Sequence, residues 1–208
     1  MELNYLNSIR KQFEYYKHLG EQTFDQLEEK DLFWKFNEES NSIAIIVNLL
    51  QGNMKSRWTD FLISDGEKEW RNRDLEFEPI ISSKEELLKK WNEAWECLFL
   101  ALNSINKENF NTEVYIRNQG HTVMEAINHQ FAHYSYHIGQ IVYVARMIKG
   151  DTWKSLSIPK GKSSNYNVEK FSKEKRPEHF SDEILDKKGP IENRLDLINL
   201  TFKNGKNS

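Results

Sequence analysis

Residues 121–149 carry three histidines spaced four residues apart, His129, His133 and His137. The segment contains no proline, and its apolar residues recur at helical spacing, which predicts one long amphipathic helix. Side chains four residues apart on a helix lie one turn apart on the same side. A pair of imidazoles at that spacing can offer two nitrogens to one ion of the zinc type. His133 and His137 are therefore the candidate metal ligands.

A helical projection places His133 and His137 at the flank of the apolar stripe of this segment. Gln140 shares that flank, and no aromatic side chain stands directly above or below the pair, which leaves room for a ligand. A catalytic metal site would also need a third protein ligand and an open coordination position. The alternative interpretation is that these histidines lie on the helix surface or in an interface and are hydrated by water.

Length and composition indicate a folded protein rather than a disordered one. The chain has 208 residues, of which 38% are hydrophobic and 29% charged, and this suits a soluble domain with a substantial core. The net charge of −3, without a basic arm, argues against nucleic acid as a partner. Neither a signal peptide nor an apolar run long enough to span a membrane is visible. The expected location is the cytoplasm.

The single cysteine, Cys97, excludes an internal disulfide framework and fits a reducing compartment. It lies in an apolar helical run, so a core thiol is favoured over a nucleophile.

Apolar residues recur at helical spacing in four segments, which are residues 3–29, 43–63, 83–105 and 121–149. Four long helices that share one core predict an all-α fold, an up-and-down or crossed four-helix bundle. We expect this bundle to occupy residues 1–165. Residues 166–208 are highly polar and form a C-terminal extension, partly ordered or mobile, with a short helix expected between residues 184 and 202.

The connections between the predicted helices carry further signals. Residues 64–82 are a polar loop with charges of both signs, either a salt-bridged loop or a lid that faces a substrate. Residues 112–117 alternate and predict a short extended piece. Gly52 lies in the middle of a predicted helix, which indicates that another helix or a ligand comes close to it.

Two blocks of sequence together resemble a known superfamily. The first is IAIIVNLLQGNMKSRWTDFLISDGEKEWRNRD, and the second is AINHQFAHYSYHIGQIVYVARMIKGDTWKSLSIPKGKS. They are similar to a branch of unknown function within the DinB-like (YfiT-like) four-helix bundle superfamily. The similarity spans residues 3–165, so the polar extension lies outside it.

The resemblance implies a divalent metal, zinc or nickel, held by three histidines. Two of them come from an H-x-x-x-H pattern followed by G-Q, which matches His133, His137 and the Gly139-Gln140 step. The third comes from the second helix, just before a G-N step. Leu49 holds that place in this chain, and its side chain has no donor atom. The resemblance therefore implies a weakened or lost metal site.

The helical projection also defines a candidate cleft between the second and fourth predicted helices. Its lining residues are Leu49, Asn53, Asp60, His129 and Gln140. Asp60 lies about three turns from Leu49, roughly 16 Å along the axis, so its carboxylate cannot simply replace the missing imidazole. His129 lies one turn before His133 and can join it only around an ion held off-centre.

Two functions follow as hypotheses from the resemblance. Members of the superfamily include metal-dependent transferases that act on small thiols such as bacillithiol or mycothiol, and the first hypothesis is a relative of these enzymes. The second hypothesis is a non-catalytic module of the same fold that binds a small molecule or forms a homodimer after losing its metal.

Overall fold

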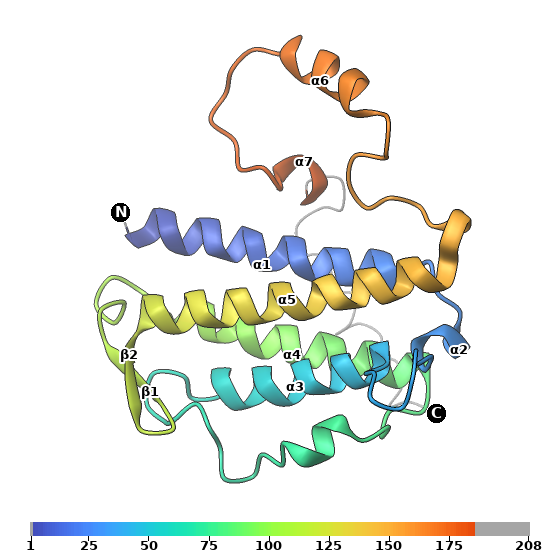
Figure 1. Ribbon diagram of the computed structural model, residues 1–208. Helices are drawn as coiled ribbons and strands as arrows, with labels where there is room; N and C mark the ends of the chain where they lie inside the picture. The colour runs from blue at the N-terminus through green and yellow to red at the C-terminus, as the bar shows by residue number, and fades with distance from the viewer. Residues whose placement is uncertain (1, 186–208) are drawn as a thin grey trace, which may run out of the picture. The chain divides into compact units, whose positions relative to one another are not determined.

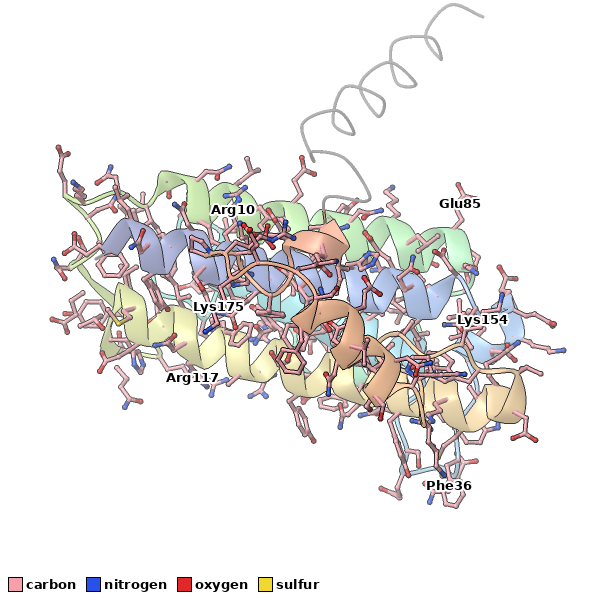
Figure 2. All side chains as sticks on the ribbon, turned by 90° about the horizontal axis from the view of Figure 1, so that it is seen from above. Arg10, Phe36, Glu85, Arg117, Lys154 and Lys175 are labelled. Carbon is pink, nitrogen blue, oxygen red and sulfur yellow. The ribbon has the colours of Figure 1, made fainter. Side chains whose placement is uncertain are left out.

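The computed structural model describes residues 2–185, which are mostly helical, so the all-α prediction is confirmed. The four long helices are α1 (Glu2–Phe24), α3 (Ile43–Trp58), α4 (Lys84–Ser104) and α5 (Val123–Lys149). Figure 1 shows these helices lying side by side, and the closest pairs are α3 with α4 and α1 with α5. The charged side chain of Glu85 on α4 points outward (Figure 2).

One aromatic cluster joins all four long helices. The ring of Phe13 on α1 lies 5.4–6.5 Å from the rings of four residues on the other three helices. These residues are Trp58, Trp95, Phe131 and Tyr134. Burial of such large side chains supplies much of the free energy of folding, and edge-to-face contacts add to it. The four helices therefore share one hydrophobic core.

Two of the predicted helices end earlier than expected. The helix expected over residues 3–29 stops at Phe24, and a short helix α2 (Glu29–Leu32) follows it. Helix α3 begins after Ser42, whose hydroxyl accepts a hydrogen bond from the Ile45 amide at 3.3 Å. It ends at Trp58 rather than residue 63, because Asp60 adopts a left-handed backbone conformation with φ 51°.

A β-hairpin precedes α5. Strand β1 (Glu113–Ile116) was expected as an extended piece, and it pairs antiparallel with β2 (Gln119–Thr122), which was not. The two turn residues between the strands both have positive φ, as a two-residue hairpin turn requires. Thr122 then caps α5 in a capping box with Glu125, so the helix starts at Val123.

The remaining described elements are short. They are η1 (Asp74–Phe77), η2 (Gly150–Thr152), α6 (Ser163–Phe171) and α7 (Asp182–Leu185). Helix α6 starts before residue 166 and continues into the segment that was expected to be a partly ordered or mobile extension. The chain divides into two compact units, Met1–Lys173 and Glu174–Ser208. The short helix expected between residues 184 and 202 lies largely outside the described residues, and the predicted domain boundary after residue 165 stays a prediction.

Candidate functional site

His133 and His137 face each other on α5. Their Nε2 atoms lie 3.1 Å apart, and the two rings are nearly perpendicular, with centroids 4.7 Å apart. Two nitrogens that each lie 2.0–2.1 Å from a tetrahedral ion are about 3.3 Å apart. The two imidazoles are thus placed close to the spacing of two ligands of one ion.

Gln140 determines which nitrogen of His137 carries the proton. Its carbonyl oxygen Oε1 lies 2.8 Å from Nδ1 of His137, and its Nε2 donates to the Tyr136 hydroxyl at 3.0 Å. Because the amide oxygen can only accept, Nδ1 of His137 is the donor, and the Nε2 lone pair faces His133. Histidines that bind metals usually donate their other ring N–H in this way. Gln140 therefore holds His137 in the tautomer that a ligand needs.

The surroundings of His133 favour its neutral form. Burial lowers the pKa of His133 to about 4, and the nearby His137 and the guanidinium groups of Arg57 and Arg71 act in the same direction. Burial also lowers the pKa of His137. Both rings are therefore uncharged at neutral pH, which is the form that binds metal.

Helix α3 presents Leu49 and Asn53 among the predicted cleft residues. Leu49 is half-buried, whereas Asn53 is buried and its Oδ1 accepts a hydrogen bond from the Tyr134 hydroxyl at 3.0 Å. That hydroxyl in turn accepts from Nε1 of Trp58 at 2.9 Å. The polar atoms of Asn53 and Tyr134 thus link α3 to α5 immediately next to His133.

The other two predicted cleft residues have different surroundings. Asp60 lines a groove of about 410 Å³ between the end of α3 and α4, together with Cys97. It does not join the histidine pair. His129 is exposed on α5 and reaches His133 only through its electrostatic effect on that ring.

The connection from Thr59 to Ser82 contributes a buried ion pair. The sequence predicted a salt-bridged loop over residues 64–82 as one alternative, without the partners or their burial. Arg71 donates to Glu76 through Nε at 2.7 Å and Nη2 at 2.9 Å, and the two side chains are 4% and 7% exposed. Glu76 lies against Gly52, where an added Cβ would come within 2.1 Å of the carboxylate. Asn48 also donates to the backbone carbonyl of Glu76 at 3.0 Å. The neighbour that Gly52 predicted is therefore Glu76.

A second carboxylate in this connection gathers three guanidinium groups. Oε2 of Glu67 lies 3.1 Å from Arg57, 3.3 Å from Arg71 and 3.2 Å from Arg117. The plain interpretation of residues 64–82, a salt-bridged loop, describes these contacts. With Glu76 the cluster brings three guanidinium groups and two carboxylates together, and Arg57 and Arg71 of this cluster act electrostatically on His133.

The side chains at this site supply only some of the ligands that a divalent ion needs. His133 and His137 supply two nitrogens, but Leu49 supplies nothing, and no group of three His, Cys, Asp or Glu side chains suited to a metal ion occurs within residues 2–185. A structural zinc site takes four protein ligands and a catalytic one three. The residues therefore fit a weakly held ion that takes its other ligands from outside the protein.

Comparison with known proteins identifies a family. The model of a family described as a protein of unknown function (DUF1572) matches residues 1–162, which include all four long helices and the histidine pair. No curated protein matches the chain. None of the helices within residues 2–185 is both long and apolar enough to cross a membrane.

Proposed function

Since this chain belongs to the DUF1572 family of proteins of unknown function, we propose that its histidine pair binds zinc or nickel weakly and that a small thiol completes the coordination. In this proposal the four long helices are a DinB-like four-helix bundle. The protein is then a relative of the metal-dependent thiol S-transferases of the bacillithiol type. The observation that carries the proposal is the 3.1 Å separation of the two Nε2 atoms, with Gln140 holding His137 in the ligand tautomer.

Residues of this chain account for the binding of the thiol. His133 and His137 hold the ion, and Gln140 fixes the direction of the His137 lone pair. The guanidinium groups of Arg57 and Arg71, which act electrostatically on His133, favour an anionic ligand over a neutral one. A divalent ion, when bound, lowers the pKa of a thiol that coordinates it and so favours the thiolate.

The second candidate is a non-catalytic module that binds a small molecule or a second copy of the chain. Leu49 favours it, because a side chain without a donor leaves the ion with two protein ligands. The histidine pair also has an arrangement that needs no ion. With the proton of His137 on Nδ1, Nε2 of His133 can donate directly to Nε2 of His137.

Metal-binding titrations separate the two candidates. The purified chain is dialysed against zinc, nickel or manganese, and the bound metal is measured beside His133→Ala, His129→Ala and Leu49→His. His129→Ala is the matched control, because it removes an exposed imidazole from the same helix. Our proposal expects binding by the unmodified chain, loss in His133→Ala, and at least a tenfold tighter site in Leu49→His.

The opposite result supports the non-catalytic candidate. If the unmodified chain takes up no metal and binding appears only in Leu49→His, the native site no longer binds metal because Leu49 stands in place of the third histidine. For a chain that does bind metal, transfer of a small thiol to a model electrophile is measured with and without the ion. Absence of any metal-dependent transfer rejects the transferase half of the proposal and leaves the binding half standing.

A further inference from the structure

A small cavity of about 10 Å³ lies where four parts of the chain meet. Arg57 lines it from the end of α3, Gly66 from the following turn, Ile116 from the hairpin, and Ala126 and Gln130 from the start of α5. Figure 1 shows that the hairpin and the start of α5 lie at the same end of the molecule as the end of α3. A cavity of this size accommodates about one water molecule.

Two buried polar atoms of the lining residues have no hydrogen-bond partner within the described part of the chain. They are Nε of Arg57, a donor, and Oε1 of Gln130, an acceptor. The two residues are only 8% and 3% exposed, so bulk water does not reach these atoms. Another nitrogen of Arg57, Nη1, is already engaged by the Gly66 carbonyl and by Glu67. Buried polar atoms almost always have a partner, so two unpartnered atoms on residues that line the same cavity point to a ligand.

We propose that the cavity binds a single water molecule, which accepts a hydrogen bond from Nε of Arg57 and donates one to Oε1 of Gln130. The ligand must both accept and donate, and it must be no larger than the cavity. Ammonium cannot accept from the guanidinium, chloride cannot donate to the amide oxygen, and a metal cation is repelled by the positive charge of Arg57. Water also satisfies the Gln130 amide in its reversed orientation, because it can accept from the amide nitrogen.

The bound water has a structural role that does not depend on the proposed metal site. It links the end of α3 to α5 at Gln130, three residues before His133. It adds a polar connection between α3 and α5 to those that Asn53 and Trp58 make with the Tyr134 hydroxyl. A water held by two buried groups exchanges slowly compared with water at the surface.

Nuclear magnetic resonance on the full chain tests the proposal. We expect a dipolar cross-peak between water and the Nε proton of Arg57, distinguished by its sign in a rotating-frame experiment from direct proton exchange. The cross-peak should disappear in Gln130→Met, which removes the acceptor at similar volume, and should remain in the control Gln51→Met on α3. A missing cross-peak in the unmodified chain, or one that survives in Gln130→Met, overturns the proposal.

A second variant keeps the test decisive if Gln130→Met does not fold. Ala126→Val adds volume to the cavity lining and should displace the water, so that Nε of Arg57 and Oε1 of Gln130 lose their shared partner. We expect the cross-peak to vanish and Tm to fall by about 2–8 °C. In a dry cavity the added methyl groups would fill empty space instead, and an unchanged or higher Tm contradicts the water site.

Discussion

At the scale of single residues, the neighbours of His133 and His137 determine the tautomer and the charge of the pair, while the four-residue spacing determines its geometry. Gln140 assigns the tautomer of His137, and burial keeps His133 neutral. Neither property requires a metal ion, so both can be measured in the metal-free protein. They therefore test the candidate site independently of any assay for binding or catalysis.

The low pKa of His133 makes the stability of the protein depend on pH. Its pKa is about 4 in the folded chain, mainly because burial penalises the charged ring, against an ordinary value of 6.5. Between these values the unfolded chain binds a proton that the folded chain does not, so the free energy of unfolding falls as the pH is lowered. The contribution of the neutral His133 ring to the free energy of unfolding is therefore fully present above pH 6.5. We expect His133 to account for a loss of about 1–2 kcal/mol between pH 7 and pH 4.5, allowing for its partial exposure.

Urea unfolding at the two pH values measures this loss. Other groups also titrate in this range, so the contribution of His133 is the difference between the unmodified chain and His133→Gln. The variant should be less sensitive to acid. An identical pH dependence in the two proteins would show that His133 titrates normally.

The sequence predicts the histidine pair better than it predicts the rest of the site. The four-residue spacing of His133 and His137 already places them on one side of a helix, as observed. A salt-bridged loop was one interpretation of residues 64–82, but the pairing of Arg71 with Glu76 and its burial were not predicted. The pair forms only when an irregular connection folds back against α3, and no periodicity encodes that path. Gly52 was the one local signal, and it indicated a close neighbour without identifying it.

At the scale of elements, Gly52 and Gly139 form a matched pair of helical glycines in opposite surroundings. A Cβ at position 52 would meet the Glu76 carboxylate at 2.1 Å, whereas one at position 139 would meet nothing within 4 Å. Glu76 cannot move aside cheaply, because Arg71 holds it in a buried ion pair. We expect Gly52→Ala to lower the free energy of unfolding by about 2–4 kcal/mol. Gly139→Ala should raise it by about 0.5–1 kcal/mol.

Urea unfolding of the two alanine variants checks this expectation. The two substitutions have the same intrinsic effect on a helix, so a difference between them reports the contact with Glu76. Equal effects in both variants would mean that the connection around Glu76 adapts without cost. Loss of the Arg71–Glu76 contact in Gly52→Ala can also be followed directly by the exchange of the Arg71 guanidinium protons.

The Asp65 carboxylate links the β1–β2 hairpin to the connection after α3 by hydrogen bonds. Asp65 accepts hydrogen bonds from the backbone amides of Glu67, Arg117 and Asn118 at 2.7–2.8 Å. Burial raises the pKa of Asp65, but these backbone hydrogen bonds outweigh that effect and hold the pKa below its usual value. In Asp65→Ala we expect the amides of Arg117 and Asn118 to exchange with solvent at least about tenfold faster. The Asn106 amide, bonded to Asn109 at 2.8 Å, is the internal control, and uniform acceleration would indicate global destabilisation instead.

The boundaries of elements were predicted well where local capping decides them. Ser83 caps α4, with its hydroxyl accepting from the Glu86 amide at 3.1 Å, and the helix starts within one residue of the predicted residue 83. The sequence reasoning failed at the end of α3, because the left-handed conformation of Asp60 reflects the tertiary path of the chain. It also missed strand β2, because QGHT lacks the β-branched alternation of β1, and its conformation depends on pairing with that strand.

At the scale of the whole molecule, the apolar core formed by residues 2–185 lies within the first compact unit. Its buried residues run from Ile9 to Ala145, and the rings around Phe13 connect the four long helices. The family match ends at residue 162, also within this unit. The four long helices and the candidate site therefore belong to the first 173 residues.

This division predicts that a chain ending at Lys173 folds with the stability of the full protein. Because the shortened chain keeps every residue of the core and both histidines, its Tm should lie within about 2 °C of the full-length value. The matched control is a chain that ends at Gln140, which lacks Ile141 and Ala145 from the core and should not fold cooperatively. Circular dichroism during heating measures both. A large fall in Tm for the chain ending at Lys173 would show that residues 174–208 stabilise the fold, and the site would then have to be studied in the full chain.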